Sequence, residues 1–151
     1  MKNNLPTPSN SKSERAQSLV EFAISLLLIL TILTGAVEIS LASFEYVTIS
    51  NAAQEGALYG SINAVPANHA AIKARVIDSA SDGVALDVDE IGIGALGSGF
   101  CEKTVSGVPN QIRVTITHPH RIVMPLAGTF LGQQINLSAS ATDTILGPVC
   151  P

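Results

Sequence analysis

Residues whose chemistry could support catalysis or metal binding are sparse in this chain of 151 residues. His118 and His120 form its one closely spaced histidine pair, but Pro119 between them favours an extended backbone that separates the two rings. A zinc site needs further ligands, and the remaining histidine is His69. We therefore interpret the pair as part of a surface turn.

Two other patterns are reminiscent of cation or nucleotide sites. Asp87, Asp89 and Glu90 lack the glycine and the spaced ligands of a calcium-binding loop, which favours a solvated strand face. The glycines of GIGALGSG (92–99) are not part of a βαβ unit, as dinucleotide binding requires. No Ser/His/Asp set stands out, so we expect neither an enzyme nor a cofactor.

One acidic residue is informative because of its position. Glu21 lies at the start of an uncharged apolar run, 22–37, whose 16 residues would measure about 24 Å as a helix. With the apolar residues at 19–20 and 39–44, the segment is long enough to cross a hydrocarbon core of about 30 Å. A carboxylate that enters the bilayer costs about 2–3 kcal/mol or more. Glu21 therefore either has a function there or lies in the headgroup layer.

The distribution of charge predicts the topology. Lys2, Lys12 and Arg15 precede the apolar segment, and the next basic residue is Lys73. The positive-inside bias puts the N-terminus in the cytoplasm and everything after Phe44 outside, with a single pass through the cytoplasmic membrane. The net charge is −4 and the later basic residues are scattered, which gives no sign of a nucleic-acid partner.

The two cysteines, Cys101 and Cys150, would lie in an oxidising compartment on this topology. We favour a disulfide between them over two free buried thiols. Such a bridge would close a long loop and tie down the C-terminal tail, which is typically worth about 2–4 kcal/mol.

Apolar periodicity predicts the elements that position these groups. A polar leader, 1–16, precedes a helix that starts near Gln17 and continues beyond the membrane until Pro66 breaks it. Small residues that would let another backbone approach closely repeat every four positions along this helix: Ala52, Gly56 and Gly60. The approaching element is either a helix of another subunit or the sheet of the same domain.

The remaining sequence predicts a small α+β domain. A second helix is expected over 68–80, and strands over 84–91, 111–117 and 135–142, with 92–110 as a glycine-rich loop. Pro119 should end the middle strand, and a short helix could follow Met124 and Pro125. Strands gathered after helices indicate an antiparallel sheet packed on the extracytoplasmic half of the long helix.

The segment 15–37, RAQSLVEFAISLLLILTILTGAV, resembles the N-terminus of TadE-like proteins, pseudopilins of the tight-adherence (Flp) branch of type IV pilus systems. In that family a basic residue and a small residue precede a Q-x-L-V-E-F run, here Gln17 to Phe22, and a hydrophobic helix follows. NAAQEGALY (51–59) is similar to the small-residue pattern after the membrane helix of these proteins. The resemblance covers about residues 14–60.

The resemblance implies cleavage by a prepilin peptidase at the inner membrane, between Ala16 and Gln17, although the family usually has glycine in place of Ala16. Glu21 and Phe22 then become the fifth and sixth residues of the mature protein. The new amine of Gln17 is positive, and the Glu21 carboxylate of a neighbouring subunit can neutralise it within an apolar bundle, because buried charges need partners. The implied partners are the peptidase, other pilin or pseudopilin subunits, the pilus assembly platform and inner-membrane lipid.

The expected domains are a cytoplasmic leader (1–16), a transmembrane and assembly helix (17–44) and an extracytoplasmic α+β domain (45–151) of a minor subunit that could enter an extracellular pilus. Two alternatives stay open. One is a secreted protein with a signal peptide cleaved near 34–36 or 40–42, for which the apolar run is long and its acidic start atypical. The other is a membrane-tethered binding domain without a pilus role, which would need neither Glu21 nor a small residue at position 16.

Overall fold

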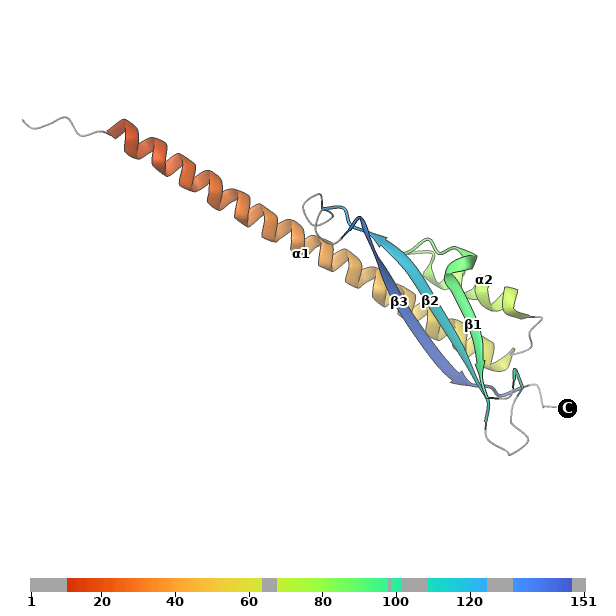
Figure 1. Ribbon diagram of the computed structural model, residues 1–151. Helices are drawn as coiled ribbons and strands as arrows, with labels where there is room; N and C mark the ends of the chain where they lie inside the picture. Colours follow the sequence, from red (N-terminus) through yellow and green to blue (C-terminus); the bar gives the residue numbers. More distant parts are fainter. Residues whose placement is uncertain (1–10, 64–67, 98, 102–108, 125–131, 148–151) are drawn as a thin grey trace, which may run out of the picture. The chain divides into compact units, whose positions relative to one another are not determined.

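The computed structural model describes residues 11–63, 68–97, 99–101, 109–124 and 132–147. Over these residues the chain forms two α-helices, a 3-10 turn and three strands: α1 (Ser11–Ile62), α2 (His69–Ala80), η2 (Val88–Glu90), β1 (Ile91–Leu96), β2 (Gln111–Arg121) and β3 (Gln134–Thr144) (Figure 1). The chain divides into two compact units, residues 1–37 and 38–151, and α1 supplies residues to both.

Helix α1 is long because no proline interrupts residues 11–62. It begins at Ser11, six residues before the predicted start at Gln17, and the sequence between them (SKSERA) is rich in good helix formers. The predicted leader is therefore helical from Ser11, whereas residues 1–10 lie outside the described part. The end at Ile62 agrees with the predicted break near Pro66.

The apolar part of α1 meets the length and hydropathy of a membrane span, with a mean hydropathy of 2.3 and none of that window buried. Both threonines of this part form hydrogen bonds inside the helix. The hydroxyls of Thr31 and Thr34 donate to the carbonyls of Leu27 (2.8 Å) and Leu30 (2.9 Å). This N-terminal helix is therefore a candidate membrane anchor.

The three strands form one antiparallel sheet in the order β1-β2-β3. β1 pairs with the first half of β2, from Ile91 opposite Ile116 to Leu96 opposite Gln111. β3 pairs with β2 over its whole length, from Gln111 opposite Thr144 to Arg121 opposite Gln134. The end of β2 beyond Ile116 thus has a paired strand on one side only.

One face of this sheet packs on the second half of α1 and on α2, which confirms the predicted α+β class and layout (Figure 1). β2 supplies the centre of the core, because its inward side chains alternate with exposed ones. Side chains with no exposed surface come from α1, α2 and β2: Ile49, Ala52 and Ala53 of α1, Ile72, Val76 and Ala80 of α2, and Ile112, Val114 and Ile116 of β2. The predictions of α2 and β3 are also confirmed.

The prediction of the first strand was wrong in position. Residues 84–87 have no regular structure, η2 follows, and β1 lies in the stretch that was predicted as a glycine-rich loop. Val84 and Leu86 are buried although they pair with no strand. In β1, Ile91 and Ile93 face inward, and Gly92 and Gly94 face solvent. The side chains therefore alternate as in a strand, but two of the solvent-facing positions are glycines, which hides the alternation in the sequence.

Pro119 does not end the middle strand, because β2 continues to Arg121. Proline lacks an N–H and is tolerated where a strand lacks a partner on one side. Pro119 stands opposite Asn136 of β3 and lies beyond the last residue paired with β1, so the sheet accommodates it. The short helix considered after Met124 falls on residues 125–131, outside the described part.

Candidate functional site

Both residues of the predicted cleavage site and Glu21 share one surface of α1. Because four residues make about one helical turn, Ala16, Val20 and Ile24 follow one another along the helix, with Gln17, Glu21 and Ser25 beside them, and all of these line one surface groove. The side chains of Glu21 and Phe22 are exposed, Phe22 to 64%. The carboxylate of Glu21 therefore stands on the same face as the Ala16–Gln17 peptide bond and is accessible to another molecule.

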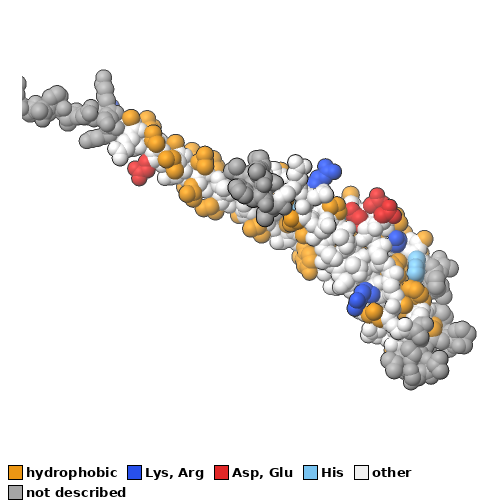
Figure 2. Space-filling view, in the orientation of Figure 1, with side chains coloured by type: hydrophobic (Ala, Val, Ile, Leu, Met, Phe, Trp, Pro, Cys, Tyr) orange, Lys and Arg blue, Asp and Glu red, His pale blue; other side chains and the backbone are white. Residues whose placement is uncertain are grey.

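Around Glu21, the apolar side chains of the N-terminal unit are uncovered. Leu19, Leu27 and Leu33 are 69%, 66% and 56% exposed, and Figure 2 shows hydrophobic side chains along this part of α1. Exposed apolar surface on this scale marks a membrane or protein contact. Bilayer lipid or apolar helices of other proteins fit it chemically.

The small residues of α1 serve the fold of this chain. Ala52 is fully buried, and a Cβ atom added to Gly56 would lie 2.3 Å from Val76 Cγ2 of α2. One added to Gly60 would lie 2.6 Å from Ile112 Cδ1 of β2. Of the two interpretations of this stripe, the structure supports close approach to the domain's own helix and sheet.

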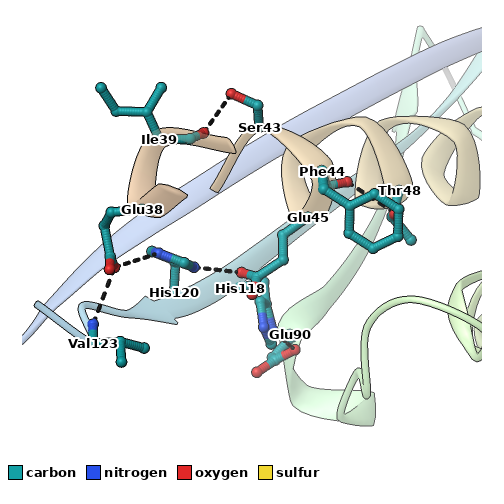
Figure 3. Close-up of polar contacts among 10 residues, drawn as sticks. All are labelled: Glu38, Ile39, Ser43, Phe44, Glu45, Thr48, Glu90, His118, His120 and Val123. Atoms are coloured by element: carbon teal, nitrogen blue, oxygen red, sulfur yellow. Dashed lines mark hydrogen bonds and ion pairs between the residues drawn. The ribbon is translucent and has the colours of Figure 1, made fainter. Parts of the chain in front are cut away.

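The two histidines of β2 lie on its inward face and not in a surface turn, as the sequence had suggested. His120 is 3% exposed and lies between two carboxylates of α1 (Figure 3). Its Nδ1 is 2.7 Å from Oε2 of Glu45, and its Nε2 is 3.2 Å from Oε1 of Glu38. The same Glu38 oxygen accepts the backbone N–H of Val123 at 3.0 Å.

This arrangement favours a charged imidazole. Ionised carboxylates only accept hydrogen bonds, so both contacts of His120 are satisfied when both ring nitrogens carry a proton. Burial lowers the pKa of His120, whereas the hydrogen bonds and negative charges of Glu45 and Glu38 raise it, and the net effect is a pKa above its ordinary value. The cluster Glu38–His120–Glu45 thus ties the end of β2 to α1.

His118 has a separate partner, since its Nδ1 lies 3.0 Å from Oε2 of Glu90. Glu90 was expected with Asp87 and Asp89 on a solvated strand face, but these residues form a 3-10 turn in which Glu90 Oε2 also accepts the backbone N–H of Asp87 at 3.3 Å. Within the described residues, no group of three or more His, Cys, Asp or Glu side chains is arranged to hold a metal ion.

The sequence contained a partial signal for the Glu38–His120–Glu45 cluster. Glu38 and Glu45 are seven residues apart, which places them on one helix face, and residues two apart share a face of a strand. The histidines at 118 and 120 continue the inward series Ile112, Val114, Ile116. What the spacing could not indicate was that the two faces meet.

Of the two cysteines predicted to form a disulfide, one lies within the described residues. Cys101 follows β1, and its carbonyl accepts a hydrogen bond from Nδ2 of the buried Asn110 at 2.9 Å. Cys150 lies outside the described residues. The disulfide between them therefore stays a prediction.

Comparison with known families places the N-terminal features in context. Residues 16–58 match the family described as TadE-like protein. The match begins at Ala16, contains Glu21 and the apolar run, and ends in the part of α1 that packs on the sheet. No curated protein and no solved structure matches the chain. Over residues 16–58 the chain is thus similar to TadE-like proteins, a family associated with tight-adherence pilus systems.

Proposed function

We propose that this chain is a minor pseudopilin-like subunit of a tight-adherence pilus, which acts by assembly and not by catalysis. The observation that carries the proposal is the face of α1 on which Ala16, Gln17 and Glu21 lie together, exposed, at the start of an apolar helix that matches the TadE-like family. The subunit is anchored in the inner membrane with its N-terminus in the cytoplasm and residues 45–151 outside.

In this proposal a prepilin peptidase cleaves between Ala16 and Gln17, and the released amine of Gln17 is positive at neutral pH. An isolated charge in an apolar bundle is costly, but a paired one is tolerated. The exposed carboxylate of Glu21 on an adjacent subunit supplies that pair. Phe22 and the following apolar side chains then pack against lipid or other pilin subunits, and the assembly platform receives the processed subunit.

The helical conformation of the cleavage site has a consequence for processing. Ala16 lies inside α1, and a peptide bond must leave the helix before a protease can bind it in an extended form. Glycine is less favourable than alanine in a helix by about 1 kcal/mol. We therefore expect Ala16→Gly to be processed faster than the natural chain, as measured by pulse-labelling and the gel shift of the cleaved product.

The decisive experiment is the N-terminal sequence of the protein recovered from cells. A start at Gln17 supports pilin-type processing. A start near Val37 or Ser43 would mean a secreted protein with a cleaved signal peptide, and an intact Met1 would mean a tethered binding domain with a plain anchor.

The role of Glu21 is tested by removing its charge. Glu21→Gln and Glu21→Ala should insert into the membrane normally but abolish piliation, because neither side chain neutralises the amine of Gln17. Ser25→Ala, one turn further along the same surface of α1, is the matched control and should assemble. Normal piliation in both Glu21 variants would refute the assigned role.

A further inference from the structure

The outer face of the sheet, which points away from the core formed with α1 and α2, is polar. Inward and outward side chains alternate along a strand, and β2 and β3 pair so that outward residues stand side by side, as Thr115 and Ser140 do. The outward residues in the middle of these strands are Arg113, Thr115 and Thr117 of β2, and Ser138, Ser140 and Thr142 of β3. In Figure 2 the surface over β2 and β3 is mostly white, the colour of uncharged polar side chains and backbone.

The charge of this outer face is opposite in sign to that of the chain. The sequence has 12 acidic and 8 basic residues, yet the charged side chains on the outer face of the three strands are Arg113 and Arg121. Asp143, the one acidic residue of these strands, pairs with the buried Ile112 and therefore belongs to the inward face. Within the described residues neither arginine forms an ion pair. The outer face is thus a cationic surface on an acidic protein.

Arg113 is placed to bind an anion. Its side chain is exposed, and its Nε donates to Oγ1 of Thr142 at 3.4 Å, which leaves the two terminal nitrogens of the guanidinium group. Gly94 of β1 stands opposite Arg113 on the other side, and a Cβ added to Gly94 would meet no atom of the described residues within 4 Å. No side chain of Gly94 therefore covers the guanidinium group. Two parallel N–H donors of an arginine match the two oxygens of a carboxylate.

The composition of the outer face disfavours three classes of anionic or apolar partner. Single-stranded nucleic acid stacks on aromatic side chains, and the three strands contain no Phe, Tyr or Trp. Duplex DNA carries a charge about every 1.7 Å, whereas Arg113 and Arg121 are eight residues apart, about 27 Å along β2. A membrane or a protein partner needs apolar area, and among the outward residues of the three strands it is supplied by Leu96 and Pro119 alone.

The same composition suits a carbohydrate that carries carboxylates. Serine and threonine hydroxyls both donate and accept hydrogen bonds, as the hydroxyls of sugars do. Between the two arginines the outer face presents such hydroxyls on both strands, at Thr115 and Thr117 of β2 and at Ser138 and Ser140 of β3. A flat, hydroxyl-bearing surface with widely spaced cations matches a polymer that has many hydroxyls and a carboxylate at intervals.

We propose that the outer face of the sheet binds an acidic polysaccharide, with uronate carboxylates on Arg113 and Arg121 and sugar hydroxyls on the threonines and serines between them. The ligand is a polymer, because a single sugar ring is much shorter than the distance between the two arginines. This binding site goes beyond the proposed function and does not depend on it, since all of its residues belong to the unit 38–151.

The test is isothermal titration calorimetry of the full chain in detergent with oligogalacturonate, a chain of uronic acids, in a calcium-free buffer of low salt. Arg113→Gln and Arg121→Gln each remove one charge and keep a hydrogen-bonding group. Arg75→Gln is the matched control, because it changes the net charge equally on α2, which packs on the inward face. Thr115→Val removes a central hydroxyl and keeps a β-branched side chain. Circular dichroism checks each fold, and Ser140→Ala replaces Thr115→Val if that variant misfolds.

We expect the natural chain and Arg75→Gln to bind oligogalacturonate with equal affinity. Arg113→Gln and Arg121→Gln should bind about tenfold more weakly, and Thr115→Val should show a smaller loss. No binding by the natural chain, or an equal loss in Arg75→Gln, would overturn the proposal. If a DNA oligonucleotide bound as tightly as oligogalacturonate and Thr115→Val changed neither affinity, the outer face would be a nonspecific anion-binding surface, and the assignment to a polysaccharide would be wrong.

Discussion

Substitution of Gly56 by alanine tests which element the small-residue stripe of α1 approaches. An added Cβ would lie 2.3 Å from Val76 Cγ2 and 3.4 Å from Val114 Cγ1. Ordinary carbon contacts lie at about 3.5–4.0 Å, so the Val76 methyl must retreat by more than about 1 Å. Val76 is fully buried, and a valine in a helix has one strongly preferred rotamer, so it cannot simply rotate away.

Two opposing effects set the size of the change. Overpacking of a filled core destabilises the folded state by about 1–3 kcal/mol. Replacement of glycine by alanine within a helix stabilises the folded state by about 1 kcal/mol. The net expectation for Gly56→Ala is a loss of about 0–2 kcal/mol in the free energy of unfolding. When Val76→Ala first removes the colliding methyl, the same substitution should become neutral or stabilising, with a coupling of about 1–3 kcal/mol between the two sites.

The assay is urea unfolding of the full chain in detergent, followed by amide exchange of β2. Gly94→Ala is the control, because nothing lies within 4 Å of an added Cβ there and no comparable clash should appear. The reasoning would be refuted if Gly56→Ala left stability unchanged and showed no coupling to Val76. Loss of subunit association in such a stable variant would instead assign the stripe to contacts between subunits.

Three other predictions concern ionisable and cysteine side chains. Because the pKa of folded His120 is raised above its ordinary value of about 6.5, its contribution to stability is full below that value and is lost as the pH rises through the raised pKa. Exchange of the Val123 amide should therefore accelerate with pH more steeply than in His120→Gln. Glu55→Gln should leave the urea midpoint unchanged, since its partner Arg75 is solvent-exposed. A non-reducing peptide map should contain one cross-linked peptide with Cys101 and Cys150, absent after reduction.

Long, regular patterns made much of the fold predictable. α1 was predictable because its apolar run and small-residue repeat extend over 40 residues without proline. α2 places Ile72, Val76 and Ala80 on one face, and β2 alternates strictly over its first half. In each of these elements the apolar side chains repeat with the period of the helix or strand that forms, and these same side chains are buried in the core. Local sequence and tertiary packing therefore favour the same structure.

The misplaced β1 had a different physical origin. Val84 and Leu86 alternate with polar residues because they are buried by the domain, but their backbones pair with no strand. The glycines of β1 lower its intrinsic strand preference, and pairing with β2 outweighs this. That pairing depends on the register of a segment about 20 residues away, which local sequence does not contain.

The Glu38–His120–Glu45 cluster was beyond local reasoning for a related reason, because it joins residues 75 and 82 positions apart. Its parts are individually unremarkable: acids on a helix and a histidine near a proline. They interact strongly only because the inward face of β2 packs on α1 and partly buries the two glutamates beside His120. A sequence pattern gives the face on which a side chain lies, and the fold decides what that face meets.

The cluster also explains how the sheet acquires a fixed position along α1. Contacts between apolar side chains alone constrain sliding weakly, because a two-residue shift of β2 would again present inward side chains to the helix. A shift in one direction would bring Ile122 to the place of His120 and leave Glu38 and Glu45 without their partner, and a shift in the other would bring His118 there and separate it from Glu90. An unpaired, partly buried carboxylate is costly, so the shifted packing is penalised where the native one is not. The same glutamate that ends the apolar run thereby sets the level at which the sheet begins.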